Sequence, residues 1–198
     1  HTPQEGVWLV AAARKHQRKV QMGNQRRSYA VYRDVMTALR EGLIGKVTLA
    51  KCWYGADRKS IGMGKPTAVP SHLDYELWTG PAPLRPFNAL THPRRWRAFM
   101  EYGNGIVGDM CIHMFDTVRW MMGLGWPKKI TSSGGIYMDK TGKSNIADTQ
   151  TAVFEYDGLN CVWQHRSWGT SADPEYPWSF KLYGEKGTLC GSTMQYDF

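Results

Sequence analysis

The C-terminal third of the chain contains a series of short apolar segments that are separated by turn signals. We predict strands at 128–133, 149–156, 159–167, 179–184 and 188–190. Asp157-Gly158 separates two of these segments and is typical of a β-hairpin, and Glu185-Lys186-Gly187 marks another turn. Strands joined by such short turns pair antiparallel, so this part of the chain is constrained to an antiparallel sheet.

The N-terminal part predicts helices that alternate with strands. Thr2-Pro3-Gln4-Glu5 is a capping box with proline at the first helical position, which predicts a helix to about Lys15. We further predict a strand at 20–23, a helix capped by Ser28 and ended by Gly42, and a strand at 46–54. The fold class that follows is α+β, with a mostly antiparallel open sheet, helices packed on one face, and the remnant of an α/β unit in front.

The region between residues 55 and 95 is rich in proline and glycine. Only a helical turn around 74–78 is predicted there, and a stretch this long without regular structure usually serves function. A helix is predicted from about Ile106 to Met122, where Gly123 and Gly125 end it.

Three polar side chains of this predicted helix are spaced so that they share one face. Asp109, His113 and Asp116 stand at positions i, i+4 and i+7. A carboxylate one turn from a histidine favours a general acid/base at neutral pH. The same pair is compatible with a metal site, or with a buried histidine that is hydrogen-bonded to an aspartate for structural reasons. The spacing leaves all three open.

Two glycine motifs do not fit a nucleotide site. Gly103-Asn104-Gly105-Ile106-Val107-Gly108 matches the dinucleotide pattern in letters, but the segment before it is basic and aromatic and does not resemble a buried strand. Gly64-Lys65-Pro66-Thr67 has proline where a phosphate loop needs serine or threonine. We therefore predict no cofactor-binding residue. We also assign no residue to a metal.

Aromatic side chains alternate with hydrogen-bonding groups near the C-terminus, most densely between Trp163 and Trp168. Flat apolar rings beside polar groups suit a sugar, although packing of a sheet is the simpler explanation. We predict substrate-binding roles for His165, Arg166 and Trp168.

Charge and composition exclude other classes of protein. The formal net charge is +8, but the basic residues fall in short clusters without a nucleic-acid-binding motif, so we interpret them as solvated surface and expect no nucleic-acid partner. Without a long apolar stretch we expect no membrane span. The 4 cysteines lie far apart, which argues against a zinc finger or a disulfide scaffold.

Several segments resemble the Gfo/Idh/MocA oxidoreductases. The resemblance rests, in chain order, on Asn24-Gln25-Arg26-Arg27, on residues 41–47, on residues 74–83, and on residues 105–116, which include Asp109, His113 and Asp116. The variant with Gln25-Arg26-Arg27 and the Leu77-Trp78 loop is similar to sugar-active, often exported bacterial members.

This resemblance implies an organisation and a site. Residues 1–27 would be the remnant of a dinucleotide-binding Rossmann domain, and residues 28–198 an α/β substrate and oligomerisation domain whose open sheet forms a homo-oligomer. Asp109 and His113 match the family's acid/base pair. Arg26 matches an arginine near the substrate and nicotinamide, and we add the adjacent Arg27 to the predicted substrate-binding residues.

The resulting hypothesis is the substrate-domain portion of an NAD(P)-dependent oxidoreductase acting on a sugar or polyol hydroxyl. The family's glycine-rich loop and Glu-Lys-Pro motif would precede Thr2, so we expect NAD or NADP not to be bound by this chain alone. The location would be the bacterial cytoplasm or, as in exported relatives, the periplasm. One alternative is a stand-alone hydrolase, a glycosidase or an ester- or lactone-type enzyme, in which Asp109 and His113, with His165 or His72, form a metal or acid/base site. The other is a non-catalytic carbohydrate-binding or oligomerising module.

Overall fold

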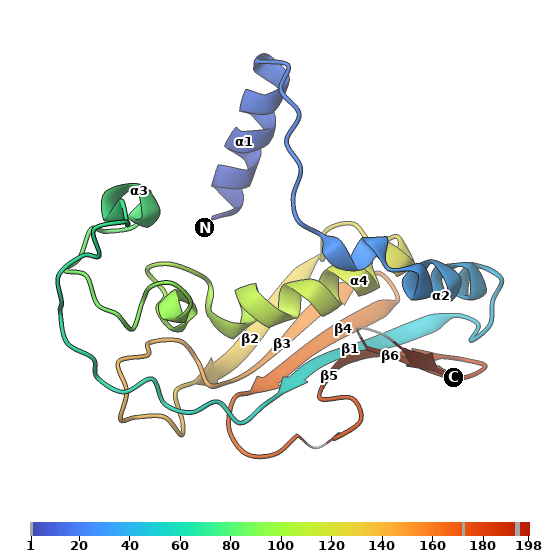
Figure 1. Ribbon diagram of the computed structural model, residues 1–198. Helices are drawn as coiled ribbons and strands as arrows, with labels where there is room; N and C mark the ends of the chain where they lie inside the picture. The colour runs from blue at the N-terminus through green and yellow to red at the C-terminus, as the bar shows by residue number, and fades with distance from the viewer. Residues whose placement is uncertain (1, 172, 193–194) are drawn as a thin grey trace.

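The computed structural model describes residues 2–171, 173–192 and 195–198 and contains one open sheet with helices over it (Figure 1). The strand order is β2-β3-β4-β1-β5-β6-β7. The strands are β1 (Val47–Gly55), β2 (Lys129–Gly135), β3 (Thr149–Tyr156), β4 (Leu159–Arg166), β5 (Trp178–Gly184), β6 (Thr188–Gly191) and β7 (Tyr196–Asp197). The strand predicted at 46–54 and the five predicted after residue 127 are therefore present, and the short edge strand β7 is an addition that the sequence did not indicate.

The sheet is antiparallel throughout except at one junction. β1 lies between β4 and β5, parallel to the first and antiparallel to the second. A parallel pair of strands needs a long connection between them. The loops, a helix and the β2–β3 pair provide that connection between β1 and β4, so that β4 can run parallel to β1. The prediction of an α+β fold with a mostly antiparallel sheet is confirmed.

Two helical segments cover the same face of this sheet (Figure 1). They are α2 (Ala30–Arg40) and the helix formed by a π-helical turn (Val107–Cys111) followed by α4 (Ile112–Met122). Alternate residues of β4 are buried beneath them, among them Cys161 and Trp163, whereas Asn160 and Gln164 point to the uncovered face. This alternation is what a sheet with one covered face requires, and it confirms the prediction that helices pack on one face.

The N-terminal helix α1 (Pro3–Lys15) stands apart from the sheet (Figure 1). Its capping box is formed as predicted, because the Thr2 hydroxyl accepts from the Glu5 amide and the Glu5 carboxylate accepts from the Thr2 amide. No residue of α1 is buried. The helix therefore follows from local sequence signals without help from the core.

Two predictions near the N-terminus are wrong. Residues 20–23 form no strand, because no other segment of the described structure pairs with their backbone. Ser28 does not cap the second helix; it closes a short 3-10 turn (Gln25–Ser28), and Tyr29 is the N-cap of α2. This turn buries Arg26, and the helix starts one residue later than predicted. Gly42 follows the end of α2 at φ +82°, as predicted for a left-handed terminating position.

The loop-rich region contains two short helical turns. α3 (Tyr75–Thr79) is capped by the Asp74 carboxylate, which accepts from the Leu77 amide at 2.9 Å, in agreement with the predicted turn. A 3-10 turn at Arg95–Ala98 leads toward the site helix. Across the described ranges, no helix is long and apolar enough to cross a membrane.

Candidate functional site

The helix that carries the predicted acid/base residues starts irregularly. Gly105 has φ +65°, and a Cβ on Gly108 would lie 2.7 Å from that of Asn104, so both positions favour glycine. The chain then makes the π-helical turn that contains Asp109 and continues as α4. The predicted helix over 106–122 is thus present with one widened turn, a feature that is frequent at functional sites.

His113 is half-buried between the helix and the sheet. Its imidazole ring meets the edge of Trp178, with the ring centroids 5.4 Å apart. Burial and the positive charge of Arg26 lower its pKa, and the charges of Asp109 and Asp116 offset only part of this effect. The imidazole is therefore neutral at pH 7, the form in which it can accept a proton.

Asp109 is only partly satisfied by its neighbours. Its Oδ1 accepts from Nε of Arg97 at 3.2 Å. Its buried Oδ2 makes no hydrogen bond within the described structure and lies 3.9 Å from Nη2 of Arg58. No hydrogen bond joins Asp109 to His113 in the described ranges, so the carboxylate acts on the imidazole through its charge.

Asp116 belongs to a different arrangement, the Asp116 cluster of Asn24, Arg27 and Asp116. Arg27 donates from Nε at 2.9 Å and from Nη2 at 2.6 Å to the two carboxylate oxygens, and Asn24 Nδ2 adds a bond of 3.1 Å. Burial raises the pKa of Asp116, but the hydrogen bonds from Arg27 and Asn24 outweigh burial and hold the pKa below its ordinary value. This cluster ties the segment before α2 to α4.

Arg26 lies beside His113 and is buried. Its guanidinium stacks on the Trp178 ring at 4.2 Å from the centroid, and its Nη1 donates to the Tyr32 hydroxyl at 3.2 Å. Trp178 in turn donates from Nε1 to the Met110 carbonyl at 3.2 Å. Trp178 therefore contacts both Arg26 and His113, and its position on β5 could not be linked to them from spacing in the sequence.

The other predicted substrate-binding residues lie at the end of β4. His165 is buried, with Nδ1 accepting from Trp163 Nε1 at 3.0 Å and Nε2 lying 3.2 Å from the Ala147 carbonyl. Burial lowers the pKa of His165. Arg166 donates to the Trp168 carbonyl at 2.7 Å, and Trp168 donates from Nε1 to the Thr149 hydroxyl at 2.7 Å. Arg26, Arg27 and His113 are thus brought together, whereas His165, Arg166 and Trp168 form a second group.

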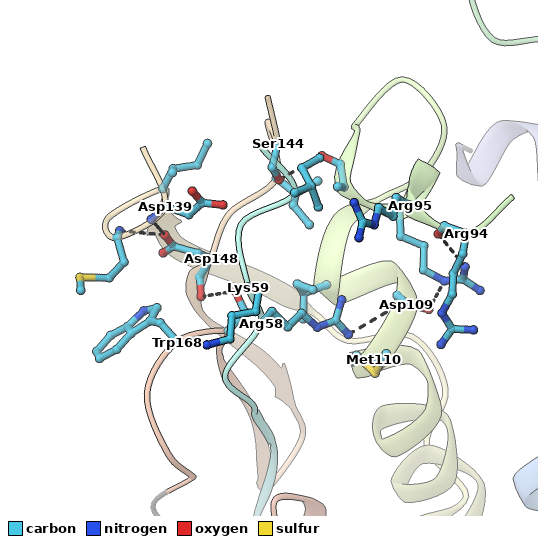
Figure 2. Close-up of a pocket in the computed structure, with 18 residues that line it drawn as sticks. Arg58, Lys59, Arg94, Arg95, Asp109, Met110, Asp139, Ser144, Asp148 and Trp168 are labelled. Carbon is cyan, nitrogen blue, oxygen red and sulfur yellow. Dashed lines mark hydrogen bonds and ion pairs between the residues drawn. The ribbon is translucent and has the colours of Figure 1, made fainter. Parts of the chain in front are cut away.

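A cavity of about 490 Å³, which we call the basic cavity, is lined by Asp109 and, of the second group, by Trp168 alone (Figure 2). Figure 2 shows Arg58 and Lys59 between Asp139, Asp148 and Trp168 on one side and Arg94, Arg95 and Asp109 on the other. Its lining residues are Arg58, Lys59, Ile61, Arg94, Arg95, Arg97, Ala98, Ile106, Asp109, Met110, Ile136, Met138, Asp139, Ser144, Ile146, Asp148, Ser167 and Trp168. A cavity of this size is in the range of small-molecule sites.

The sequence analysis does not predict the basic lining of this cavity. It interprets Arg94, Arg95 and Arg97 as solvated surface. The clustering of arginines inside a long irregular segment was the available signal. Only the fold shows that Arg58 and Lys59, which follow β1, meet that cluster.

Neither a metal site nor a dinucleotide loop is found among the described residues. They contain no group of three or more histidine, cysteine, aspartate or glutamate side chains that could hold a metal ion. The segment Gly103–Gly108 follows the 3-10 turn at Arg95–Ala98 and a further turn at 100–102, not a strand. This segment therefore does not fit the pyrophosphate loop of a dinucleotide site, which opens a helix directly after a buried strand.

Comparisons with known proteins agree on one family and one fold. A family model described as the GFO/IDH/MocA C-terminal domain matches residues 32–190. No curated protein matches the chain. An oxidoreductase from Thermotoga maritima is similar at 14% identity with a TM-score of 0.65, over 98% of this chain and 49% of that protein.

Two further solved structures have the same fold. A candidate myo-inositol dehydrogenase from Sinorhizobium meliloti 1021 is 19% identical with a TM-score of 0.59, over 92% of this chain and 44% of that protein. An Agrobacterium radiobacter oxidoreductase in complex with NAD+, L-tartaric acid and magnesium is 14% identical with a TM-score of 0.64, over 96% of this chain and 45% of that protein. This chain thus spans less than half the length of each of these structures.

Proposed function

The chain belongs to the GFO/IDH/MocA family, and on that premise we propose that it is the substrate-domain portion of an NAD(P)-dependent oxidoreductase acting on a sugar or polyol hydroxyl. The observation that carries the proposal is a neutral, half-buried His113 one helical turn from Asp109, whose carboxylate borders the basic cavity. A residue that must remove a hydroxyl proton at pH 7 needs these properties.

In the proposed reaction His113 accepts the proton of the substrate hydroxyl. The positive charge that then develops on the imidazole is favoured by the carboxylates of Asp109 and Asp116, and the contact with Trp178 holds the ring in place. Arg26 and Arg27 would border the substrate on the side of the Asp116 cluster. Trp168 lines the far end of the basic cavity and would contact the substrate there. Arg166 would hold Trp168 through its hydrogen bond to the Trp168 carbonyl, whereas His165 is buried and lies outside this lining.

The relatives support the class of substrate and cofactor. One is a candidate myo-inositol dehydrogenase, whose named substrate is a polyol, and another is described with NAD+ bound. The Gly103–Gly108 segment does not fit a dinucleotide loop. We therefore propose that the NAD(P) site lies outside this chain, and we assign none of the residues named above to the nicotinamide.

The test is an assay for reduced nicotinamide, with a panel of sugars and polyols and with NAD+ or NADP+. The chain is assayed alone and with a dinucleotide-binding domain added as a separate chain. Turnover only in the second condition, with a loss of roughly 100-fold or more in His113→Ala, is the expected result. Turnover that persists in His113→Ala overturns the role of His113. Hydrolysis without nucleotide that a chelator abolishes overturns the oxidoreductase in favour of a metal hydrolase. Sugar binding without turnover in either condition indicates a non-catalytic module.

We also propose a homo-oligomer formed through the uncovered face of the sheet. That face carries a hollow of about 510 Å³ along β1, β3 and β4, with Trp53 and Val162 in its lining. Sedimentation equilibrium tests this assembly directly. Val162→Arg, which places a charge on this face, is expected to dissociate it, and a monomeric wild-type chain overturns the proposal.

A further inference from the structure

The basic cavity contains more positive charge than its own carboxylates use. Five cationic side chains and three carboxylates line it. The cationic residues are Arg58, Lys59, Arg94, Arg95 and Arg97, and the acidic residues are Asp109, Asp139 and Asp148.

Two of the three carboxylates are engaged within the protein, and the third, Asp139, forms no ion pair with a lining cation in the described structure, so several cations have no counter-charge. Asp148 is buried and accepts three backbone amides, those of Tyr137, Met138 and Asp139, at 2.8 to 3.1 Å. Asp109 pairs with Arg97 and, more distantly, with Arg58.

Lys59, Arg94 and Arg95 consequently form no ion pair within the described part of the chain. All three side chains are exposed and border the same hollow. A ligand that enters the cavity thus meets solvent-exposed guanidinium and ammonium groups that form no ion pair with the described residues.

The rest of the lining matches a ring that has an apolar face and hydroxyl groups. Ile61, Ile136 and Ile146 provide apolar surface, the Trp168 ring lies at the edge, and Ser144 and Ser167 provide hydroxyls. Arginine pairs in a bidentate manner with planar carboxylates and with phosphates.

The geometry points to a ligand class that the proposed function leaves open: the basic cavity binds an anionic carbohydrate, a sugar or polyol that carries a carboxylate or a phosphate. Lys59, Arg94 and Arg95 contact the anionic group, and the hydroxyl-bearing part extends toward Asp109. The site itself is inferred from the cavity alone, whereas the identification of its ligand as the substrate rests on the proposed function.

Titration calorimetry with D-glucuronate, D-glucose 6-phosphate and D-glucose at one ionic strength tests the inference. We expect at least one of the two anions to bind about 10-fold or more tightly than glucose, and the better of them identifies the anionic group as carboxylate or phosphate. The inference is overturned if glucose binds as tightly as the anions, or if neither anion binds.

Matched variants separate the site from the general charge of the protein. Arg94→Gln combined with Arg95→Gln is expected to weaken binding of the anion about 10-fold or more, and Arg33→Gln, on the exposed side of α2, is expected to leave it unchanged. Equal binding by the double variant and the wild type, or an equal loss in Arg33→Gln, overturns the inference. If the double variant has a lower melting temperature, Lys59→Gln provides the second measurement and is expected to weaken binding in the same direction.

The two proposals fail in different ways. His113→Ala is expected to abolish turnover and to retain anion binding. Anion-selective binding without turnover in the wild type overturns the proposed function and leaves the site standing, whereas turnover of neutral polyols without anion selectivity overturns the site and leaves the proposed function standing.

Discussion

The Asp116 cluster and the basic cavity lie on opposite sides of His113 along one helix, and they use charge differently. In the Asp116 cluster one carboxylate receives three hydrogen bonds from Asn24 and Arg27. At the basic cavity Asp109 receives one hydrogen bond, and three neighbouring cations have no carboxylate partner among those described.

The difference in hydrogen bonding distinguishes a carboxylate that joins two segments from one that can contact a ligand. A fully paired carboxylate such as Asp116 fixes two segments to each other, and it has little capacity left for a ligand. A carboxylate with one unbonded oxygen, at the wall of a cavity, can still accept a hydrogen bond from a ligand. We therefore expect Asp116 to serve mainly the structure and Asp109 the function, and each variant below tests that division.

The largest effect is expected from Asp109→Asn. This change removes the negative charge that favours the protonated imidazole, and it should lower turnover in the oxidoreductase assay by about 100-fold. The isosteric Asp116→Asn also removes a charge that acts on the imidazole, but Arg27 already pairs with that carboxylate, so this variant should lower turnover much less than Asp109→Asn. An equal loss of turnover in the two variants would break the comparison.

Asp148→Ala is expected to destabilise the wall of the basic cavity. Three backbone amides lose their acceptor, so the free energy of unfolding should fall by about 1–3 kcal/mol in urea denaturation. Asp139→Ala is the control and should change stability much less, because among the described residues the Asp139 carboxylate accepts only a long bond of 3.4 Å from the Thr141 hydroxyl.

The effect of Asp148 depends on pH in a defined direction. Burial raises the pKa of Asp148, but hydrogen bonds from the amides of Asp139, Met138 and Tyr137 outweigh it and hold the pKa below the ordinary value. The stabilisation is therefore complete above the ordinary aspartate pKa of about 3.9 and is lost as pH falls through the lower folded-state value. A difference between Asp148→Ala and wild type that does not narrow in acid would contradict this origin.

Asp116→Asn should destabilise the fold by a smaller amount, about 1 kcal/mol, because Arg27 is 43% exposed and solvent screens the pair. Denaturation at low and high salt checks this prediction. The loss should shrink as salt rises, since screening already weakens the pair in the wild type. A loss of several kcal/mol that is independent of salt would show that the cluster acts as a buried pair.

The smallest expected effect concerns the pKa of His113. Arg26 lowers it through its charge, so Arg26→Gln should raise it, and the acid limb of the activity profile should move to higher pH. Arg26→Lys keeps the charge and should shift the pKa less. NMR titration of the imidazole measures both variants, and an unchanged pKa in Arg26→Gln would show that burial alone sets it.

Much of this structure was predictable because its signals are local. The capping box at Thr2 and Glu5, the turn at Asp157-Gly158 and the glycines after Met122 each act within a few residues, and the corresponding elements formed where predicted. The strand predicted at 20–23 failed because a strand depends on a partner that no local signal provides. The predicted start of α2 at Ser28 failed because the burial of Arg26 in a 3-10 turn outweighed a good capping residue.

The sequence by itself determined the helix that carries Asp109, His113 and Asp116, and the family to which that helix belongs. Tertiary structure decided what each of the three contacts, because most of their partners lie far away in the chain. Asp116 meets Arg27 across 89 positions, and Trp178 on β5 reaches both Arg26 and His113. The insertion of β1 between β4 and β5 places Arg58 and Lys59 beside the arginines of another loop. Helical spacing depends on bonds between near neighbours, whereas a binding cavity depends on how distant segments pack.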